Sequence, residues 1–351
     1  MIGISLLTLV PGELGGSETY ARELLRALRG GSLEYRVLLP PAAPGAAEGL
    51  PARLCTGYRL ARTPRRRLLA MSAAAARPGR LGRELDGCSA VHYPLTLRIP
   101  AVDTPSVVTL HDVQHLDQPG LFSPGERAFR RLAWHRSVRG ATLVIVPSGF
   151  VRDRAAARLV LDPQRIRVVH SGVDHARFAP GAGEREPFLL YPARPWPHKN
   201  HAVLYRAFEL LRRERPELRL VLTGGGHSGA LPDGVEALGL VDLDELASLY
   251  RRASALVFPS LYEGFGQPPL EAMASGCPVA CSNAAALPEI VGDAARLFDP
   301  TDPAALAEAV RDVLTAPGEW SRRGLERAAG FSWEATARAH EAVYREASTR
   351  S

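Results

Sequence analysis

The residues of this chain with the clearest capacity for chemistry lie in EGFGQPPLEAMASGCPV, residues 263–279. The segment carries two carboxylates, Glu263 and Glu271, and a carboxylate can accept several hydrogen bonds from sugar or ribose hydroxyl groups. Gly264 and Gly266 lie between them, and glycines let backbone amides approach a bound phosphate closely. Together these groups indicate a site for a nucleotide sugar. The alternative is a glycine-rich turn with one solvated Glu and a second Glu that only favours a helix dipole.

Two flanking runs position these carboxylates. The apolar run ALVFPS (255–260) predicts a buried strand, and PLEAMASG (269–276) predicts a short helix. Glu263 is therefore expected on the turn that leaves the strand. Glu271 is expected in the first turn of the helix, where backbone amides lack intrahelical partners and the dipole is positive.

A second group of candidate residues surrounds Lys199, the only lysine in the sequence. It follows the strand-like run FLLYPA (188–193) on a proline-rich loop that also carries Arg194. A guanidinium fork and a compact ammonium on a rigid loop can clamp a diphosphate. Ligands of open α/β sheets bind outside the carboxyl ends of the strands, where this loop is expected. A solvated pair of loop charges is the alternative.

Length and composition set the broad class. At 351 residues, with 46% hydrophobic and 23% charged residues, the chain is expected to form a soluble globular protein of two domains. The N-terminal run MIGISLLTLVPGELGG predicts a first strand over residues 2–10 rather than a signal peptide, because it lacks a basic lead. No apolar run approaches the length of a membrane span. The four cysteines show no metal spacing and are expected to be buried and reduced, in a cytoplasmic protein.

The formal net charge is +6, and arginines concentrate in residues 59–83. This segment could contact the inner face of a membrane or an acidic acceptor. It lacks the interleaved aromatic residues of a platform for single-stranded nucleic acid, so no nucleic-acid partner is expected. A solvated arginine-rich helix is the alternative.

Alternation of strand-like and helix-like runs predicts α/β architecture, with a parallel sheet covered on both faces, in each of two halves. The first domain is expected over 1–178 and the second over 187–330, joined by the Gly- and Pro-rich stretch 178–187. Helices are predicted over 124–141 and 242–253. The tail, 331–351, predicts an amphipathic helix over 331–348 that packs against another element.

Two motifs could indicate other chemistry. TGGGHSG (223–229) contains the G-x-G-x-x-G of dinucleotide sites, but a proline and a glycine soon follow and argue against an immediate helix. A loop that shapes a nucleotide-base pocket is favoured. His111 and Asp112, with His115, could suggest a metal site, but such sites need further ligands. We therefore expect no metal, and Asp112 is interpreted as a loop or cap acceptor.

The motifs occur in an order that resembles a known family. GELGGSE (12–18), His111 and Asp112 after a strand, R-x4-K ending at Lys199 and E-x7-E starting at Glu263 span nearly the whole chain. In this order they resemble the retaining glycosyltransferases of family 4, which includes bacterial mannosyl- and glucosyltransferases and sucrose synthases. The resemblance implies a GT-B fold: two Rossmann-like domains whose parallel sheets face across a cleft, with a C-terminal helix that crosses back to the N-terminal domain.

The resemblance also implies a role for each motif residue. Glu263 would hold hydroxyl groups of the donor sugar, and Glu271 those of the ribose. Arg194 and Lys199 would neutralise the diphosphate, and His111 would help to position the donor sugar. The remaining members are backbone amides that would contact the phosphate or sugar: Gly15, Gly16, Gly264, Phe265 and Gly266.

The chemistry of sugar transfer agrees with these roles. Breaking the sugar–phosphate bond builds negative charge on the diphosphate, and fixed cations and amides stabilise that charge. The expected activity is transfer of a hexosyl group from GDP-mannose or a UDP- or dTDP-sugar to a hydroxyl of a small-molecule, glycan or lipid acceptor, without metal or cofactor. A GT-B epimerase, a non-catalytic nucleotide-sugar-binding protein and a hydrolase with paired carboxylates are the alternatives. The chain departs from the family at Ala193, where a glycine is common.

Overall fold

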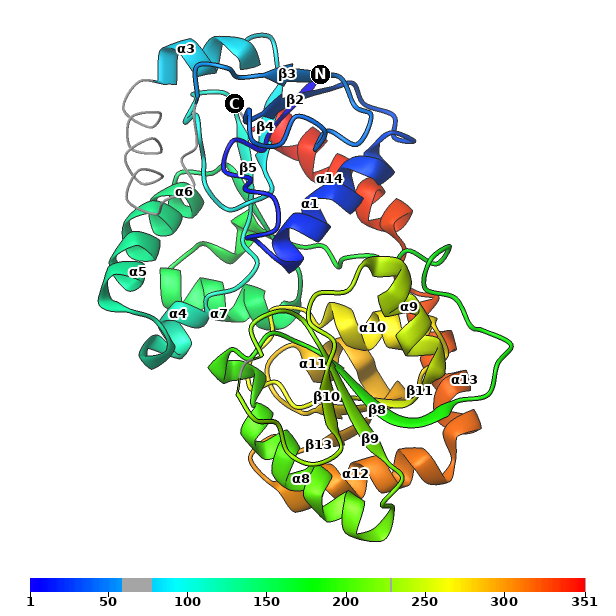
Figure 1. Ribbon diagram of the computed structural model, residues 1–351. Coiled ribbons are helices and arrows are strands. Elements are labelled where there is room, and N and C mark those ends of the chain that lie inside the picture. The colour runs from blue at the N-terminus through cyan, green and yellow to red at the C-terminus, as the bar shows by residue number, and fades with distance from the viewer. Residues whose placement is uncertain (59–77, 228, 351) are drawn as a thin grey trace. The chain divides into compact units, whose positions relative to one another are not determined.

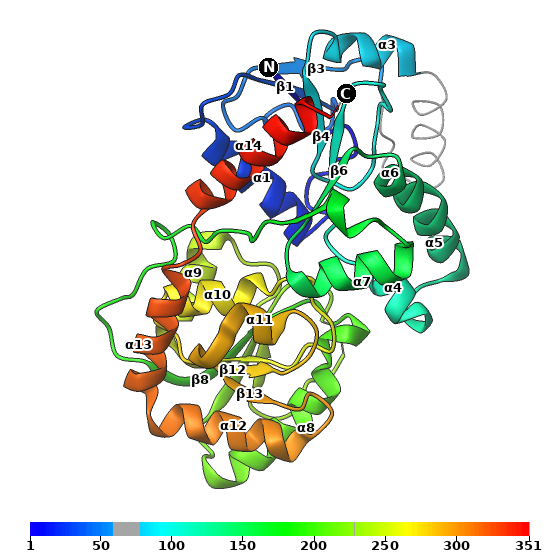
Figure 2. The same ribbon diagram turned by 180° about the vertical axis from the view of Figure 1, so that it is seen from behind.

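The computed structural model of the protein describes residues 1–58, 78–227 and 229–350. The chain divides into two units, coloured along the sequence in Figures 1 and 2. Unit 1 comprises Met1–Ser171 and Trp333–Ser351, and unit 2 is Gly172–Ser332. The C-terminal residues therefore belong to the same unit as the N-terminal ones.

Unit 1 contains, within its described residues, one seven-stranded sheet with the order β3-β2-β1-β4-β5-β6-β7, and every pairing is parallel. The strands are β1 (Ile2–Ser5), β2 (Tyr35–Leu39), β3 (Ala52–Leu54), β4 (Ala90–Tyr93), β5 (Ser106–Thr109), β6 (Leu143–Val146) and β7 (Ile166–Val168). The second and fourth strands lie on opposite sides of β1. The strand order therefore reverses between β1 and β4, the type of position at which α/β sheets bind ligands.

Residues of this sheet alternate between two hydrophobic cores. Val37 and Leu39 of β2 belong to the core that also contains Tyr344, whereas Leu38 belongs to the core that contains Val151. Successive side chains of a strand point to opposite faces, so the sheet is buried on both sides, as predicted for a parallel sheet.

The helices of unit 1 are shown in Figure 1. They are α1 (Gly16–Leu28), α3 (Pro78–Gly82), α4 (Gln114–Asp117), α5 (Pro124–Phe129), α6 (His135–Arg139), α7 (Gly149–Leu159) and α14 (Trp333–Ser348). Short 3-10 turns occur at η1 (Arg83–Leu85), η2 (Pro119–Leu121) and η4 (Pro163–Arg165), and η3 (Arg130–Trp134) is a π-helical turn. The helix predicted over 124–141 is therefore observed in three pieces, α5, η3 and α6.

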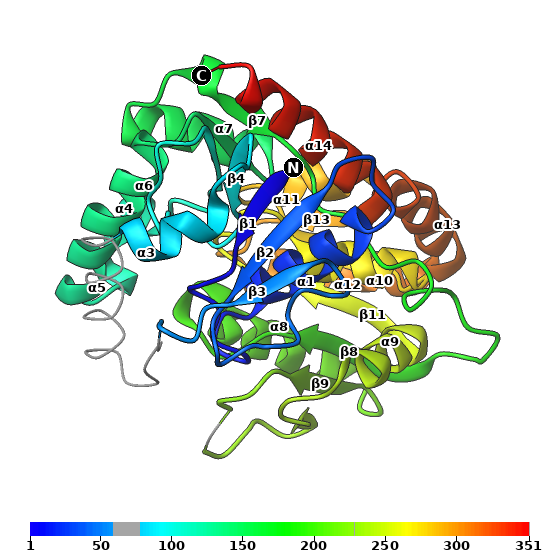
Figure 3. The same cartoon turned by 90° about the horizontal axis from the view of Figure 1, so that it is seen from above.

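The C-terminal helix α14 packs beside α1, as the views in Figures 1, 2 and 3 agree. Glu341 of α14 anchors it: its carboxylate accepts hydrogen bonds from the backbone amides of Ser32 and Leu33 and from the Tyr35 hydroxyl. These bonds lower the pKa of Glu341 against the opposing effect of its burial. Trp333 and Tyr344 add apolar surface to the core below.

Unit 2 has, within the described chain, a six-stranded parallel sheet with the order β10-β9-β8-β11-β12-β13. The strands are β8 (Glu186–Pro192), β9 (Arg219–Thr223), β10 (Val235–Ala237), β11 (Ala253–Phe258), β12 (Val279–Ser282) and β13 (Arg296–Phe298). The order reverses between β8 and β11. The carboxyl ends of these two strands therefore define the ligand-binding position expected for unit 2.

The helices of unit 2 are α8 (His201–Glu214), α9 (Leu243–Arg252), α10 (Gln267–Ala274), α11 (Leu287–Val291), α12 (Pro303–Thr315) and α13 (Pro317–Ala328). Two 3-10 turns, η5 (Pro197–Lys199) and η6 (Gly292–Ala294), complete the unit. α9 agrees with the prediction for 242–253, because Asp242 caps its first turn by accepting from the amides of Asp244 and Glu245.

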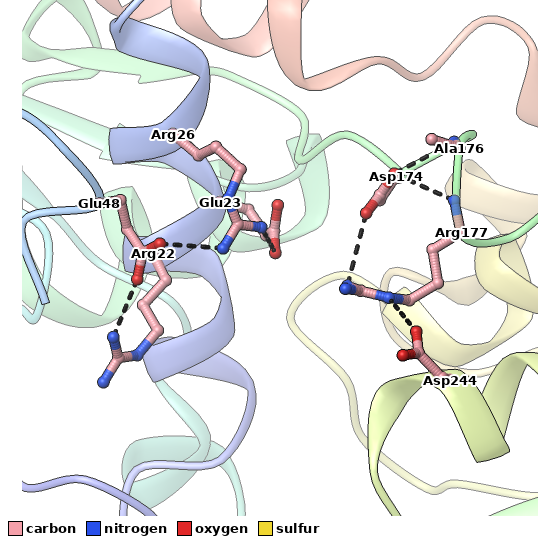
Figure 4. A network of polar contacts seen from close by, with 8 residues as sticks. All are labelled: Arg22, Glu23, Arg26, Glu48, Asp174, Ala176, Arg177 and Asp244. Carbon is pink, nitrogen blue, oxygen red and sulfur yellow. Dashed lines mark hydrogen bonds and ion pairs between the residues drawn. The ribbon is translucent and has the colours of Figure 1, made fainter. Parts of the chain in front are cut away.

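Figure 4 shows two polar networks, one within each unit. In unit 1, Glu48 accepts from Arg22 and Arg26, both at 2.9 Å, and so ties α1 to the loop after β2. In unit 2, Arg177 pairs with Asp174 at 3.4 Å and with Asp244 of α9 at 2.9 Å. The residues just after 171 are thus fastened to unit 2, ahead of the stretch 178–187 that was expected as the linker.

None of the helices in the described part of the chain combines the length and the apolar character that a bilayer crossing needs. Residues 59–77 of the arginine-rich segment lie outside the described residues, so its expected membrane contact stays a prediction. All four cysteines are buried and free, as expected. The two parallel sheets with helices confirm the predicted α/β class.

Candidate functional site

The strand order of unit 2 reverses between β8 and β11, and this point brings together two residues that the sequence separates by 64 positions. Lys199 follows β8, Glu263 follows β11, and the lysine Nζ donates to the glutamate Oε1 at 2.5 Å. The two side chains are only 13% and 16% exposed. The ammonium also lies 5.3 Å from the ring centroid of Phe258. An ammonium carries three N–H donors, so Lys199 can pair with Glu263 and still bind an incoming anion.

Sequence reasoning missed the residues that hold the Lys199 loop. The Tyr191 hydroxyl donates to the backbone carbonyl of Lys199 at 2.6 Å. Asn200 adopts a left-handed conformation with φ 61°, and its side-chain amide donates to the carbonyls of Pro259 and Pro300 at 3.2 and 2.6 Å. The available signal was an Asn immediately before a helix-like run, since Asn tolerates this conformation. The loop after β8 that carries Arg194 and Lys199 is called the clamp loop here. The Asn200 bonds hold it against the loop after β11, which carries Glu263, and the loop after β13.

Arg194 lies on the same loop, with its guanidinium 5.7 Å from the centroid of Trp196, a ring that is 47% exposed. Its backbone is fixed by Gly224: a Cβ there would lie 3.0 Å from Ala193 C and from Arg194 N. Gly224 also has φ +97°, so both conformation and space require glycine. His227 donates from Nε2 to the carbonyl oxygen of Ala193 at 3.0 Å.

The TGGGHSG motif therefore supports the clamp loop. After it the chain forms β10, not a helix. A dinucleotide fingerprint needs a helix N-terminus immediately after its glycines to bind the pyrophosphate. The structure thus argues against a dinucleotide-binding site at this motif.

Glu271 lies deeper in its helix than predicted. α10 begins at Gln267, two residues before the predicted start, so Glu271 is not in the first turn. Proline has no N–H and a fixed φ, which suits the start of a helix, so Pro268 and Pro269 extend α10 rather than precede it. The Glu271 carboxylate is buried and accepts a hydrogen bond from the Tyr250 hydroxyl at 3.1 Å. Burial of Tyr250, and after it the nearby Glu271 carboxylate, raise the pKa of Tyr250.

The α10 N-terminus has few amides to offer an anion. Two of the four leading positions are prolines, so the backbone donors left there are those of Gly266 and Gln267. Gly266 has φ +115°, and a Cβ there would lie 2.7 Å from Cδ2 of Leu287. Phe265 anchors the preceding turn, because it is buried and packs against Phe331 with centroids 6.2 Å apart.

In unit 1 the predicted glycines lie at the start of α1. Gly15 is the N-cap with φ 54° and ψ −130°, a combination that disfavours residues with a Cβ. A Cβ on Gly15 or Gly16 would meet no atom within 4 Å among the described residues, so packing does not demand glycine there. Glu18 folds the loop by accepting from the Gly12 amide at 2.8 Å. The amides of Glu18 and Thr19 donate to the Gly15 carbonyl, and the amides before them, at the start of α1, can face an anion.

His111 follows β5 at the same edge of the unit 1 sheet. Its Nε2 lies 2.9 Å from the carbonyl oxygen of Pro94, which only accepts, so Nε2 carries a proton. The Tyr20 ring packs edge-on against the imidazole at 4.9 Å between centroids. Burial lowers the pKa of His111, opposed by the Pro94 bond and by Asp112. The neutral imidazole therefore keeps Nδ1 as an acceptor for a hydroxyl group.

Asp112 serves as a loop acceptor, taking the Gln114 amide at 2.9 Å with Arg130 4.0 Å away. His115 contacts His135 through the two Nε2 atoms at 3.1 Å. Within the described residues no group of three His, Cys, Asp or Glu side chains could hold a metal ion.

A cavity of about 620 Å³ lies in unit 1 beside α4 and α5. The predicted site residues are not among its lining, which is mainly apolar: His115, Leu116, Pro119, Pro124, Arg127, Ala128, Arg131 and Leu132. The candidate donor site is therefore built from strand-end loops and not from this cavity.

Comparison with known proteins agrees with this arrangement. Two family models match the chain: Glycosyltransferase Family 4 matches residues 14–177, and Glycosyl transferases group 1 matches residues 173–329. The second match nearly coincides with unit 2.

Relatives span most of the chain. O-antigen chain mannosyltransferase B of Escherichia coli is 32% identical over 65% of this chain and 67% of its own length. D-inositol 3-phosphate glycosyltransferase of Frankia alni is 33% identical over 69% of each chain. The corresponding protein of Streptomyces scabiei is 29% identical over 95% of this chain and 86% of the relative.

Solved structures share the fold. Sucrose-phosphate synthase of Thermosynechococcus elongatus aligns with a TM-score of 0.79 at 22% identity, over 100% of this chain and 99% of that one. HepE of Anabaena, solved with UDP and glucose, aligns with a TM-score of 0.73 at 17% identity, over 98% of this chain and 99% of that one.

Proposed function

Because this chain belongs to glycosyltransferase family 4, we propose that it is a retaining, metal-independent hexosyltransferase. The donor is a nucleoside-diphosphate sugar, such as GDP-mannose or a UDP- or dTDP-sugar. The acceptor is a hydroxyl group of a small molecule, a glycan or a lipid. The observation that carries this proposal is the partly buried Lys199–Glu263 pair, at the point where the strand order of the unit 2 sheet reverses.

The pair supplies two functions at one place. In the proposed donor complex, Glu263 accepts hydrogen bonds from the sugar hydroxyls, and the free N–H donors of Lys199 contact the diphosphate. Arg194, on the same loop, adds a second cation. As the sugar–phosphate bond breaks, negative charge grows on the diphosphate next to these fixed cations, which lowers the barrier.

The neighbouring groups have separate roles in the proposal. The amides of Gly264, Phe265 and Gly266 contact the phosphate or sugar, and Glu271 binds the ribose hydroxyls while held by Tyr250. In unit 1, the amides at Gly15 and Gly16 contact the diphosphate. His111 accepts a hydrogen bond from a donor-sugar hydroxyl through its neutral Nδ1.

The pairing of Glu263 favours transfer over hydrolysis by two carboxylates. A glycosidase needs one carboxyl that stays protonated as general acid and another that is free to attack or activate water. Glu263 is instead paired with an ammonium, and Glu271 accepts a hydrogen bond from a buried tyrosine. We propose no covalent protein nucleophile, and the departing phosphate assists deprotonation of the acceptor.

The test begins with donor binding. Thermal shift with GDP, UDP and dTDP, and with GDP-mannose, UDP-glucose and dTDP-glucose, should identify a stabilising ligand. Turnover of that donor is then measured with and without EDTA, and the anomeric configuration of the product is read by NMR. Retention and full activity in EDTA are expected.

Other outcomes would overturn parts of the proposal. Binding of none of the six compounds would remove the donor site. Inversion would remove the retaining mechanism, and activity lost in EDTA and restored by Mg²⁺ would remove metal independence. Incubation with donor alone separates the alternatives: an epimerised donor indicates an epimerase, whereas slow release of nucleoside diphosphate indicates a transferase.

A further inference from the structure

A ring of buried hydrogen bonds joins α14 to the elements around His111. Tyr344 contacts Nδ1 of His92 at 2.8 Å, and Nε2 of His340 contacts the Tyr20 hydroxyl at 2.7 Å. Thr109 joins these two contacts, with Oγ1 2.9 Å from Nε2 of His92 and 3.1 Å from the Tyr20 hydroxyl. The four bonds run from Tyr344 to His340, and together with the backbone of α14 between these residues they form the closed loop that is called the ring below. None of these five side chains is more than 6% exposed.

Each bond in the ring has one possible direction. Nδ1 of His340 lies 2.8 Å from the carbonyl oxygen of Thr336, so in the neutral ring this nitrogen carries the proton. Nε2 then accepts, so Tyr20 donates to His340 and Thr109 donates to Tyr20. The same reasoning makes Nε2 of His92 a donor to Thr109 and its Nδ1 an acceptor from the tyrosine of α14. Burial lowers the pKa of both histidines, to about 4 for His340, which keeps them neutral.

The ring starts and finishes on α14 and passes through residues close to His111 in space or in sequence. The Tyr20 ring packs edge-on against the imidazole. His92 is two residues before Pro94, whose carbonyl oxygen accepts from His111. Thr109 is the last residue of β5, two residues before His111. The ring can therefore hold the groups that contact the imidazole.

The ring is not the only attachment of α14. Glu341 fastens the helix independently, through Ser32, Leu33 and Tyr35. Four hydrogen bonds among buried polar side chains cost desolvation and return little net stability. A purely structural helix could be held by apolar packing instead, so the ring calls for another explanation.

We propose that the C-terminal helix positions His111 through this ring, with Tyr20 and His340 as positioning residues for the transfer reaction. The inference rests on the proposed function of His111 in donor-sugar binding. The ring predicts that a change at His340, whose hydrogen bonds go to Tyr20 and Thr336, alters turnover more than it alters nucleotide binding.

The first test does not depend on activity. His340→Leu removes the acceptor of the Tyr20 hydroxyl, and crystal structures of this variant and of the wild-type protein are compared. We expect the Tyr20 and His111 rings to separate beyond 4.9 Å and the Pro94 bond of 2.9 Å to lengthen. Unchanged positions of both rings would overturn the inference.

The second test is kinetic and includes a matched control. Tyr20→Phe keeps the aromatic ring but loses the hydroxyl. Tyr35→Phe is the control, because it deletes an equally buried hydroxyl that bonds to Glu341 of α14 outside the ring. Tyr20→Phe and His340→Leu should each lower kcat roughly tenfold or more, because small misplacements of reacting groups are costly. Donor KM should change less than about threefold, and Tyr35→Phe should leave kcat within about twofold of the wild type. A kcat loss in Tyr35→Phe equal to those of the two ring variants would overturn the proposal.

A double-mutant cycle separates positioning from structure and from the proposed function. If Tyr20 acts through His111, Tyr20→Phe should cost no further activity in the His111→Ala background. Independent, additive losses would overturn the positioning role. Full activity of His111→Ala alone would instead refute the proposed role of His111, and the crystallographic comparison would still decide whether the ring sets its position.

Discussion

Lys199 and Glu263 acquire their significance from each other. From the sequence, the lysine is expected to bind the diphosphate and the glutamate to bind the sugar, as separate contacts. The structure pairs them at 2.5 Å with little exposure. Mutual neutralisation makes two partly buried charges tolerable, and removing one partner leaves the other uncompensated. In the proposed function, this pair binds a ligand that carries both hydroxyl groups and phosphate.

Lys199→Ala should nearly abolish turnover. Loss of a fixed cation beside the leaving group costs about 3 kcal/mol or more, which corresponds to a fall in kcat of about a hundredfold or more. Steady-state turnover of the preferred donor measures this effect, and thermal melting checks that the variant folds. Arg213→Ala is the control, because its pair with Glu209 is exposed in the same unit. Turnover close to wild type in Lys199→Ala would refute the assignment.

Gly224→Ala should weaken the clamp loop. The new Cβ would lie 3.0 Å from the backbone of Ala193 and Arg194, at a φ of +97°. We expect a loss of about 1–3 kcal/mol in unfolding free energy and weaker binding of nucleoside diphosphate. Gly239→Ala is the matched control, because Gly239 has φ +73° but a Cβ there meets no described atom within 4 Å. Equal nucleotide affinity of the two variants would contradict a role in shaping the clamp.

At the scale of elements, the type of each element, helix or strand, was predicted better than its first and last residues. The tail was expected to be helical over 331–348 and is helical over Trp333–Ser348. α10 starts earlier than predicted, because the two prolines fit its first turn instead of preceding it. Strand lengths were overestimated at the N-terminus: the run 2–10 forms β1 only over Ile2–Ser5. Apolar residues after the strand are buried without continuing the ladder.

What local patterns could not predict is the partner of each element. Lys199 meets Glu263 because β8 and β11 are neighbours in the sheet, although β9 and β10 intervene in sequence. Tyr20 meets His340 across 320 residues. Such contacts depend on strand order and on the return of the chain terminus, and neither leaves a periodic signal in the sequence.

Acid should loosen the attachment of α14. The pKa of His340 is about 4 in the folded protein against an ordinary value of 6.5, so the unfolded chain binds more protons between these values. Stability is therefore lost as the pH falls from about 6.5 to about 4, by an amount on the order of 3 kcal/mol for this histidine. Urea unfolding between pH 7.5 and pH 4.5 measures it.

His340→Leu supplies the comparison for the acid titration. This variant no longer titrates at position 340, so its unfolding free energy should depend less steeply on pH in that window. Glu341 also loses its contribution as the pH falls, but at lower pH than His340. Its pKa is lowered from the ordinary value of 4.5, so its carboxylate stays ionised and keeps its hydrogen bonds until the pH falls below that value. A pH dependence identical to that of the wild type would show that His340 is not the group responsible.

At the scale of the whole molecule, the two units differ in how the chain builds them. Unit 2 is one continuous segment, Gly172–Ser332, with a complete sheet. Unit 1 needs residues from 1–171 and from 333–350, because α14 contributes Trp333 and Tyr344 to its core and both terminal groups of the buried ring. Its fold therefore depends on segments that lie far apart in the sequence.

This difference predicts unequal behaviour of fragments. A fragment of residues 172–332 should fold alone and bind the preferred nucleoside diphosphate, since it keeps its own core and the Lys199–Glu263 pair. A fragment of residues 1–171 should melt earlier or fail to fold, because without α14 it exposes apolar surface and the Tyr20 hydroxyl and His92 Nδ1 lose their partners on α14. Circular dichroism melting of both fragments measures this. A cooperative transition in fragment 1–171 at the Tm of the full chain would contradict it, and adding a peptide of residues 333–350 should raise the stability of that fragment if α14 acts through these contacts.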